Sequence, residues 1–139
     1  MWIPRTLLQR SNRLRAHALN RAVRELPLST RQAMLAAADA DELIAGAYTD
    51  GHGRACPMLA AHRRGARAHA RGFPQAWDLF ARASRPRPAT ARELEVLKAL
   101  LQESIDVERS RLSENPGPVL TGQVAGDRPA DRAPRLSKR

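Results

Sequence analysis

Residues 90–105 read TARELEVLKALLQESI, and this stretch decides the fold class. Thr90 followed three residues later by Glu93 is the signature of a capping box, in which two side chains satisfy backbone amides at the start of a helix. Behind the box, large aliphatic residues recur at the spacing of one helix face, at Leu94, Leu97, Leu101 and Ile105. The stretch therefore predicts a long helix over residues 91–112.

The segment 90–101 is also similar to the first helix of LuxR-type helix-turn-helix domains. The resemblance implies that a glycine-containing turn, a second helix and a basic recognition helix follow. Here Gln102 to Leu112 continues instead as an acidic helix, and Pro116 then breaks it. The recognition element is missing, so no DNA-reading residue is carried over. We interpret the likeness as a shared capping box and leucine pattern.

Upstream of this helix, three aromatic residues form a stripe. Phe73, Trp77 and Phe80 stand at i, i+4 and i+7, and Pro74 suits the first turn of a helix. Such a stripe is typical of a helix that faces the core. Between the two helices, Arg85-Pro86-Arg87-Pro88 predicts a stiff extended connector, because each proline fixes its own φ and restrains its neighbour.

The middle of the chain combines a turn-rich segment with a capped helix. Residues 48–54 read YTDGHGR and are dense in turn formers, which predicts a loop or a short hairpin. Pro57 suits a first helical position, with Cys56 as the cap of that helix. Gly65 either ends this helix or weakens it.

A helix is expected on each side of Pro27. The first covers residues 5–26, and its apolar side carries Leu8, Leu19, Val23 and Leu26. Its opposite side carries Arg10, Arg13, His17, Arg21 and Arg24. This basic helix either packs on the core or projects as an arm. The second helix starts at a cap at Ser29 or Thr30 and continues or restarts through Leu43 and Ile44.

Together these elements predict an all-α fold, a small bundle of four or five helices. We expect a basic amphipathic N-terminal helix over residues 1–27, a helical core domain over 28–113 and a disordered tail over 114–139. The tail is expected to be disordered because it holds four prolines, three glycines and no aromatic residue. The expected core consists of Leu35, Leu43, Ile44, Leu59, Phe73, Trp77, Phe80, Leu94, Leu97 and Leu101.

The composition indicates a thin core. Of the 139 residues, 25 are alanine and only five are aromatic. Alanine contributes little transfer free energy, so we expect marginal stability or completion of the core by a partner. The excess of Ala and Arg is also typical of GC-rich, bacterial-like coding.

Positive charge is arranged in blocks along the chain. Arginine supplies 22 of the 24 basic residues, and the net charge is +10. Residues 1–31 carry +6, residues 32–50 carry −4 and residues 51–92 carry +8. The planar guanidinium fork suits phosphate and is permanently charged. The two basic segments therefore favour a polyanionic partner.

We accordingly predict a non-catalytic accessory or regulatory protein that binds nucleic acid, or a nucleoprotein complex. Its mechanism is phosphate neutralisation without base readout, because no recognition-helix pattern is present. The N-terminal arginine face could instead be solvated, rest on anionic lipid or pair with the acids at positions 39, 41, 42 and 50. The predicted nucleic-acid-binding residues are Arg10, Arg13, Arg21, Arg24, Arg63, Arg64, Arg67 and Arg71.

Cys56 is the single cysteine of the chain and admits several roles. At a helix start near Arg54 its thiolate would be favoured, as in reactive cysteines. With His52 and His62 it could belong to a metal-binding sensor site, although the spacing is not that of a zinc finger. Cys56-Pro57 also resembles the short haem-regulatory motif. The simplest interpretation remains a capping or core cysteine, with no cofactor and no metal.

The sequence lacks the signatures of an enzyme and of a membrane-spanning protein. Paired carboxylates in an apolar setting, a phosphate-cradling glycine motif and a nucleophile elbow are all missing, so we do not expect an enzyme. No apolar run is long enough for a transmembrane segment, and the lone cysteine suits a reducing, cytoplasmic setting. The main alternative is a protein-interaction module, homo-oligomeric or with another partner, that uses the final helix or Leu8, Leu19, Val23 and Leu26.

Overall fold

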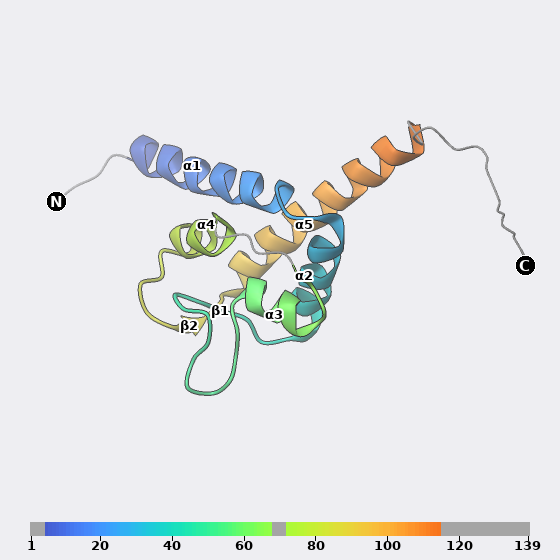
Figure 1. Cartoon of the computed structure of the whole chain (residues 1–139). Helices are drawn as coiled ribbons and strands as arrows, with labels where there is room; N and C mark the ends of the chain where they lie inside the picture. Colours follow the sequence, from blue (N-terminus) through green and yellow to red (C-terminus); the bar gives the residue numbers. More distant parts are fainter. Residues whose placement is uncertain (1–4, 68–71, 115–139) are drawn as a thin grey trace, which may run out of the picture. The chain divides into compact units, whose positions relative to one another are not determined.

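The computed structural model describes residues 5–67 and 72–114, which form five helices and two short strands (Figure 1). The helices are α1 (Arg5–Arg24), α2 (Leu28–Ala40), α3 (Pro57–Arg63), α4 (Gly72–Ala81) and α5 (Ala91–Glu114). The strands are β1 (Ile44–Ala45) and β2 (Arg87–Pro88). The predicted all-α bundle is confirmed. The tail predicted to be disordered lies, from residue 115 onward, outside the described residues.

The chain divides into two compact units, residues 1–106 and residues 107–139. The fold described below is that of the first unit, and only the last turns of α5 are described from the second. The predicted domain limits at residues 27 and 113 stay predictions.

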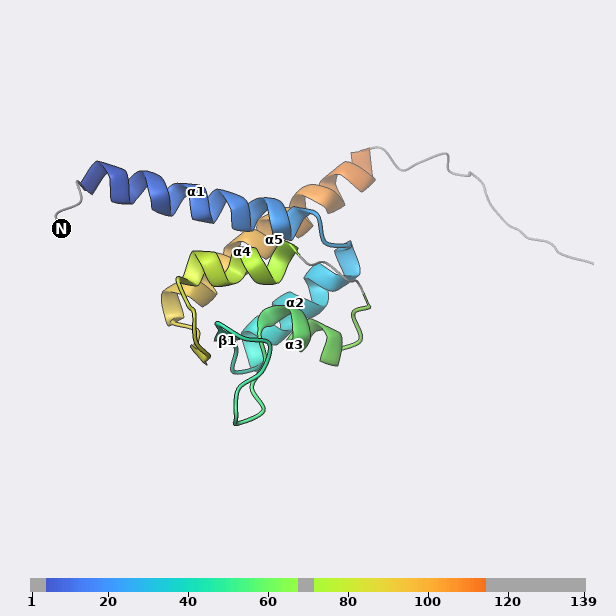
Figure 2. The ribbon, with the colours of Figure 1, turned by 60° about the vertical axis from the view of Figure 1, so that its left-hand side comes forward.

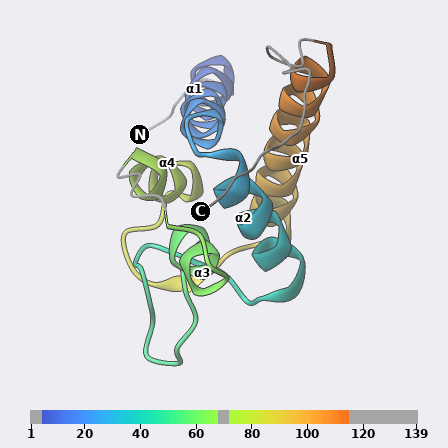
Figure 3. The ribbon, with the colours of Figure 1, turned by 45° about the vertical axis from the view of Figure 1, so that its right-hand side comes forward.

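Within the first unit, α1 packs against α4 and α2 packs against α3. Helix α4 lies between α1 above and α3 below in Figures 1, 2 and 3. Of the predicted core residues, Leu35, Leu59, Phe80 and Leu94 are partly buried. The others are fully buried, namely Leu43, Ile44, Phe73, Trp77, Leu97 and Leu101.

The N-terminal helix packs on the core through its C-terminal half. Leu19 and Val23 are completely buried and Leu26 is 1% exposed, whereas Leu14 on the outer side is 63% exposed. Asn12 adds a polar contact, since its Oδ1 accepts a hydrogen bond from the Arg82 guanidinium at 2.7 Å. The side chain of Leu8 lies outside the described residues. Of the two predicted arrangements, packing on the core is therefore the one observed.

A buried arginine joins the end of α1 to two other helices. Arg31 on α2 is only 4% exposed, and its Nε donates to the carbonyl oxygen of Leu26 at 2.9 Å. Its Nη1 donates to Ser104 Oγ on α5 at 2.6 Å. Because a buried guanidinium is costly unless hydrogen-bonded, these bonds fix the chain between α1 and α2.

The start of α5 is the predicted capping box. The Thr90 amide donates to Glu93 Oε1 at 2.9 Å, and the Glu93 amide donates to Thr90 Oγ1 at 3.1 Å. Arg87 donates to both carboxylate oxygens of Glu93, at 3.0 and 2.8 Å. The helix then runs without a turn to Glu114, as expected from the missing helix-turn-helix continuation. Leu97, Leu101 and Ile105 are buried along it.

Two predictions about α2 are wrong. The helix begins at Leu28, directly after Pro27, so neither Ser29 nor Thr30 caps it. It also ends at Ala40, because Asp41 is extended with φ −104° and ψ 157°. Leu43 and Ile44 therefore lie outside the helix.

The segment after α2 and the predicted connector form a small sheet instead. Strands β1 and β2 are antiparallel, with Ile44 opposite Pro88 and Ala45 opposite Arg87. The Ala89 amide donates to the Leu43 carbonyl oxygen at 2.9 Å and extends this pairing. Pro88 on β2 is tolerated because the sheet has only two strands, so that β2 has one edge without a neighbour.

Gly46, which follows β1, occupies a position that no other residue fits. Its φ is +93°, and a Cβ placed there would stand 2.0 Å from the carbonyl oxygen of Arg85. Its amide donates to Asp78 Oδ1 on α4 at 2.8 Å. Trp77, one residue earlier, donates from Nε1 to the Ile44 carbonyl oxygen at 3.0 Å. These contacts fix β1 against α4.

We predict that Gly46→Ala destabilises the protein far more than Gly53→Ala. Both glycines have positive φ, but a Cβ at Gly53 meets nothing within 4 Å. Backbone strain alone costs about 1–3 kcal/mol, so Gly53→Ala stays in that range and Gly46→Ala exceeds about 3 kcal/mol. Urea denaturation of both variants measures the difference, and equal losses would contradict the close contact with Arg85.

A second prediction concerns acid stability at Glu93. Burial would raise the pKa of Glu93, but hydrogen bonds from Arg87 and Thr90 outweigh burial and hold this pKa below its ordinary value. The bonded carboxylate therefore stabilises the fold above the ordinary pKa, and this contribution is lost as pH falls through the depressed value. We expect Glu93→Gln to lower the free energy of unfolding by about 1–2 kcal/mol at neutral pH.

The loss in Glu93→Gln should shrink as the pH is lowered below about 4.3, where wild type loses the same charge. The exposed Glu95→Gln is the control and should change stability by less than about 0.5 kcal/mol. Chemical denaturation over a pH series makes the comparison. A difference between wild type and Glu93→Gln that stays constant with pH would refute the proposed charge effect.

Candidate nucleic-acid interface

The outer side of α1 carries an unpaired basic stripe. Arg10, Arg13, Arg21 and Arg24 are exposed, and His17 is exposed between them. None of these four arginine side chains forms an ion pair or hydrogen bond with any residue in the described part of the chain. The helix itself contains no acidic residue. We call Arg10, Arg13, Arg21 and Arg24 the α1 stripe.

The turn-rich segment is a hairpin, the second of the two forms expected for it. Thr49 pairs with Ala55 in antiparallel fashion, and the Cys56 amide donates to the Tyr48 carbonyl oxygen at 2.8 Å. Asp50 organises the turn, since its Oδ1 accepts from the amides of His52 and Arg54 at 2.9 and 3.0 Å. Burial would raise the pKa of Asp50, but these bonds and the Arg54 guanidinium hold it below its ordinary value.

Half of the predicted second arginine set has partners within the fold. Arg64 forms a two-pronged ion pair with Asp41 at 2.8 and 3.2 Å. Hydrogen bonding by Arg64 holds the pKa of Asp41 below its ordinary value. Arg63 donates to the carbonyl oxygen of Gly53 at 2.8 Å, and Arg67 is exposed. Arg71 lies outside the described residues.

Arg63 and Arg67, four residues apart, do not share a helix face. Helix α3 ends at Arg63, and Gly65 follows with φ +102°, a left-handed conformation that stops a helix. Arg67 therefore lies beyond the helix. Of the two effects expected of Gly65, it ends the helix rather than weakening it.

Of the four acids at positions 39, 41, 42 and 50, three form ion pairs in the described part of the chain, and none of these pairs involves α1. Asp41 pairs with Arg64, Asp50 Oδ2 with Arg54 Nε at 2.6 Å, and Asp39 with Lys98 at 3.5 Å. Internal neutralisation thus accounts for part of the second basic block. It does not apply to the α1 stripe.

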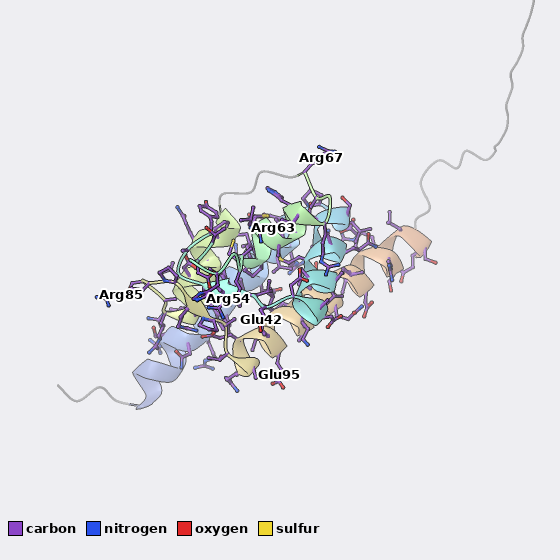
Figure 4. The ribbon with its side chains drawn as sticks, turned by 90° about the horizontal axis from the view of Figure 1, so that it is seen from below. Glu42, Arg54, Arg63, Arg67, Arg85 and Glu95 are labelled. Carbon is purple, nitrogen blue, oxygen red and sulfur yellow. The ribbon has the colours of Figure 1, made fainter. Side chains whose placement is uncertain are left out.

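The two basic sets do not converge on one surface. In Figures 1, 2 and 3, α1 lies above α4, and α3 with the hairpin lies below it. Figure 4, viewed from below, places Arg54, Arg63 and Arg67 on this lower side, with Glu42 beside Arg54. The α1 stripe is therefore the stronger candidate interface, because no acid interrupts it.

Cys56 is a structural capping residue in this fold. It is 3% exposed, and its Sγ accepts a hydrogen bond from the Leu59 amide at 3.5 Å. Burial raises the pKa of the thiol, despite hydrogen bonds from the amides of Leu59 and Met58. The thiol is therefore neutral at neutral pH, and the expectation of a favoured thiolate is wrong.

The candidate metal ligands are not brought together. His52 is exposed on the hairpin, Cys56 is buried and His62 is partly buried on α3. Among residues 5–67 and 72–114, no three His, Cys, Asp or Glu side chains gather in a way that could hold a metal ion.

Two cavities were not foreseen from the sequence. One of about 290 Å³ lies between the base of the hairpin and α4, and includes Tyr48 and Asp78 in its lining. The other, of about 260 Å³, has a mixed lining that includes Glu42, Arg54 and Arg63. Their residues are far apart in sequence, so no local pattern signals either cavity. Near the two cavities, only the turn-forming residues 50–53 form a recognisable sequence pattern.

No protein-family model matches this chain, and no curated protein or solved structure is significantly similar to it. None of the helices in the described residues is long and apolar enough to cross a membrane.

We predict that native Cys56 reacts slowly with a thiol-specific disulfide reagent at neutral pH. Its burial and raised pKa keep the thiolate fraction and the access of the reagent low. Because it is the single cysteine, the absorbance change reports this residue alone. Reactivity should rise at least about tenfold in denaturant, whereas rapid stoichiometric labelling of the native protein would restore the reactive-cysteine interpretation.

Proposed function

We propose that this protein is a non-catalytic accessory or regulatory protein that binds the phosphate backbone of nucleic acid through the α1 stripe. The proposal is based on the exposure of these arginines and on their lack of partners. All four are exposed, and none has a partner among the described residues, whereas Arg54, Arg64 and Arg87 have carboxylate partners. The fold thus leaves one long cationic surface uncompensated.

The dimensions of the stripe support this mechanism. From Arg10 to Arg24 it extends about 21 Å, at 1.5 Å per residue. A duplex presents one phosphate charge per about 1.7 Å of axis, so the stripe can follow several phosphates in succession. Each neutralised phosphate releases condensed counterions, which supplies affinity without reading any base.

The burial of the apolar side of α1 argues against the two other roles considered for this helix. An amphipathic helix binds a lipid surface by inserting its apolar face. Here Leu19, Val23 and Leu26 already belong to the core of the chain. The same burial removes these three side chains from an apolar protein interface. What α1 offers to a partner is therefore mainly charge.

We predict a salt dependence that is set by the α1 stripe. Four phosphate contacts give a slope of about −3.6 for log affinity against log salt, or about a 150-fold loss between 50 and 200 mM. Arg13→Gln with Arg21→Gln should reduce the slope to about −1.8. Fluorescence anisotropy with a short DNA duplex, repeated over a salt series, measures both slopes.

The matched control is Arg64→Gln with Arg92→Gln, which removes the same charge elsewhere. Arg64 is engaged with Asp41, and Arg92 lies on α5. This control should keep a slope within about 0.5 of wild type. Equal effects of the two double variants would show that only net charge matters, and a wild-type slope near zero would contradict the proposal in favour of an apolar interface.

A further inference from the structure

The cavity of about 290 Å³ between the hairpin and α4 has preformed walls. On one side, the Gly46 amide is bonded to Asp78 Oδ1 at 2.8 Å, which joins the end of β1 to α4. On the other, the Cys56 amide is bonded to the Tyr48 carbonyl oxygen at 2.8 Å. Its lining consists of Gly46, Ala47, Tyr48, Cys56, Pro74, Gln75 and Asp78.

Tyr48 supplies an exposed aromatic ring to this cavity. It is the single tyrosine of the chain, and 62% of it is exposed, in contrast to the buried Phe73 and Trp77. Its hydroxyl makes no hydrogen bond within the described part of the chain. The ring contributes little to the core and is available as a stacking surface.

The polar groups of the cavity are mainly acceptors. Asp78 uses Oδ1 for the Gly46 amide, and its Oδ2 makes no hydrogen bond to a described residue. The Gln75 side chain is exposed and likewise makes none in residues 5–67 and 72–114. Pro74 and the buried Cys56 add apolar surface to the lining. A fitting ligand is therefore planar and presents N–H donors to a carboxylate.

Guanidinium and guanine are two planar groups that present adjacent N–H donors, and charge favours guanine. A guanidinium side chain of a partner protein would be repelled by a chain of net charge +10. A guanine base presents the same donors, N1–H and the 2-amino group, and brings a phosphate with it. The remaining standard bases place at least one acceptor on the edge that would face Asp78. Guanine is thus the better match.

We propose that this cavity binds a guanine base, stacked on Tyr48 and hydrogen-bonded through its N1–H and 2-amino donors to Asp78. Gln75 can donate from its amide to the guanine O6. The base comes either from a free guanine nucleotide or from an unpaired guanine of a nucleic-acid strand. The second source rests on the proposed function and adds base recognition to the phosphate contacts of α1.

The first experiment uses guanosine monophosphate as the probe, with adenosine and uridine monophosphates for comparison. The Gly46 amide resonance, followed by ¹⁵N NMR, reports binding at the cavity because this amide is bonded to Asp78. Asp78→Asn keeps an oxygen for Gly46 but replaces the second acceptor with a donor. It should weaken guanine binding about 5- to 150-fold, the range of one good bidentate contact.

Tyr48 provides a matched pair of variants. Tyr48→Ala removes the stacking surface and should weaken binding about 5- to 150-fold, whereas Tyr48→Phe keeps the ring and should stay within about threefold of wild type. Because Tyr48 is exposed, both variants should keep the wild-type melting temperature. Equal losses in Ala and Phe variants would contradict stacking on Tyr48.

The second experiment separates the two sources of the base. A short oligothymidine with one central guanine is compared with the all-thymine strand. Preference for the guanine strand, lost in Asp78→Asn, supports the strand as the source. Binding of guanosine monophosphate without preference between strands supports the free nucleotide. Absence of guanine preference in both experiments overturns the proposal.

Separate variants test the guanine site and the phosphate contacts of α1. Arg13→Gln with Arg21→Gln should weaken both oligonucleotides equally and leave their affinity ratio unchanged. Asp78→Asn should change the ratio and leave the salt slope on duplex DNA unchanged. A flat salt slope together with intact guanosine monophosphate binding would remove only the role of α1 and leave the cavity as a nucleotide site.

Discussion

The burial of Leu19, Val23 and Leu26 in the core is the constraint on which the rest of the structure depends. Because Leu19 and Val23 lie on the side of α1 that packs against α4, the basic residues are forced to the opposite side. Arg31 then holds the end of α1 through Leu26 and joins it to α5 through Ser104. The same packing that stabilises the fold therefore gives α1 a fixed cationic surface.

Arginines near the hairpin are paired with carboxylates, whereas those on the outer side of α1 are not. Near the hairpin, carboxylates at positions 41 and 50 accept from arginines, and their pKa values are held below the ordinary value. These pairs organise the turn and the end of α3, so they serve local structure. On α1 no carboxylate is present to do the same. The proposed function therefore rests on the α1 arginines, which have no carboxylate partner among the described residues, and not on the total charge.

Local sequence patterns predicted the elements whose causes are local. The capping box at Thr90 and Glu93, the cap at Cys56 and the aromatic stripe of α4 were all foreseen, since each needs only neighbouring residues. The strand pair and the Arg64–Asp41 ion pair were not, because their partners are separated along the chain and each strand has only two residues. The cavity beside Tyr48 escaped prediction for the same reason, as loop and helix residues converge there.

Binding of DNA by α1 can be tested most directly at the arginine side chains themselves. Side-chain Nε–Hε resonances in ¹⁵N NMR can be followed residue by residue as a short DNA duplex is added. We predict shifts for Arg10, Arg13, Arg21 and Arg24 that saturate together, with Arg54 and Arg64 unchanged in their ion pairs. Shifts confined to Arg54, Arg63 and Arg64, or none on α1, would contradict it.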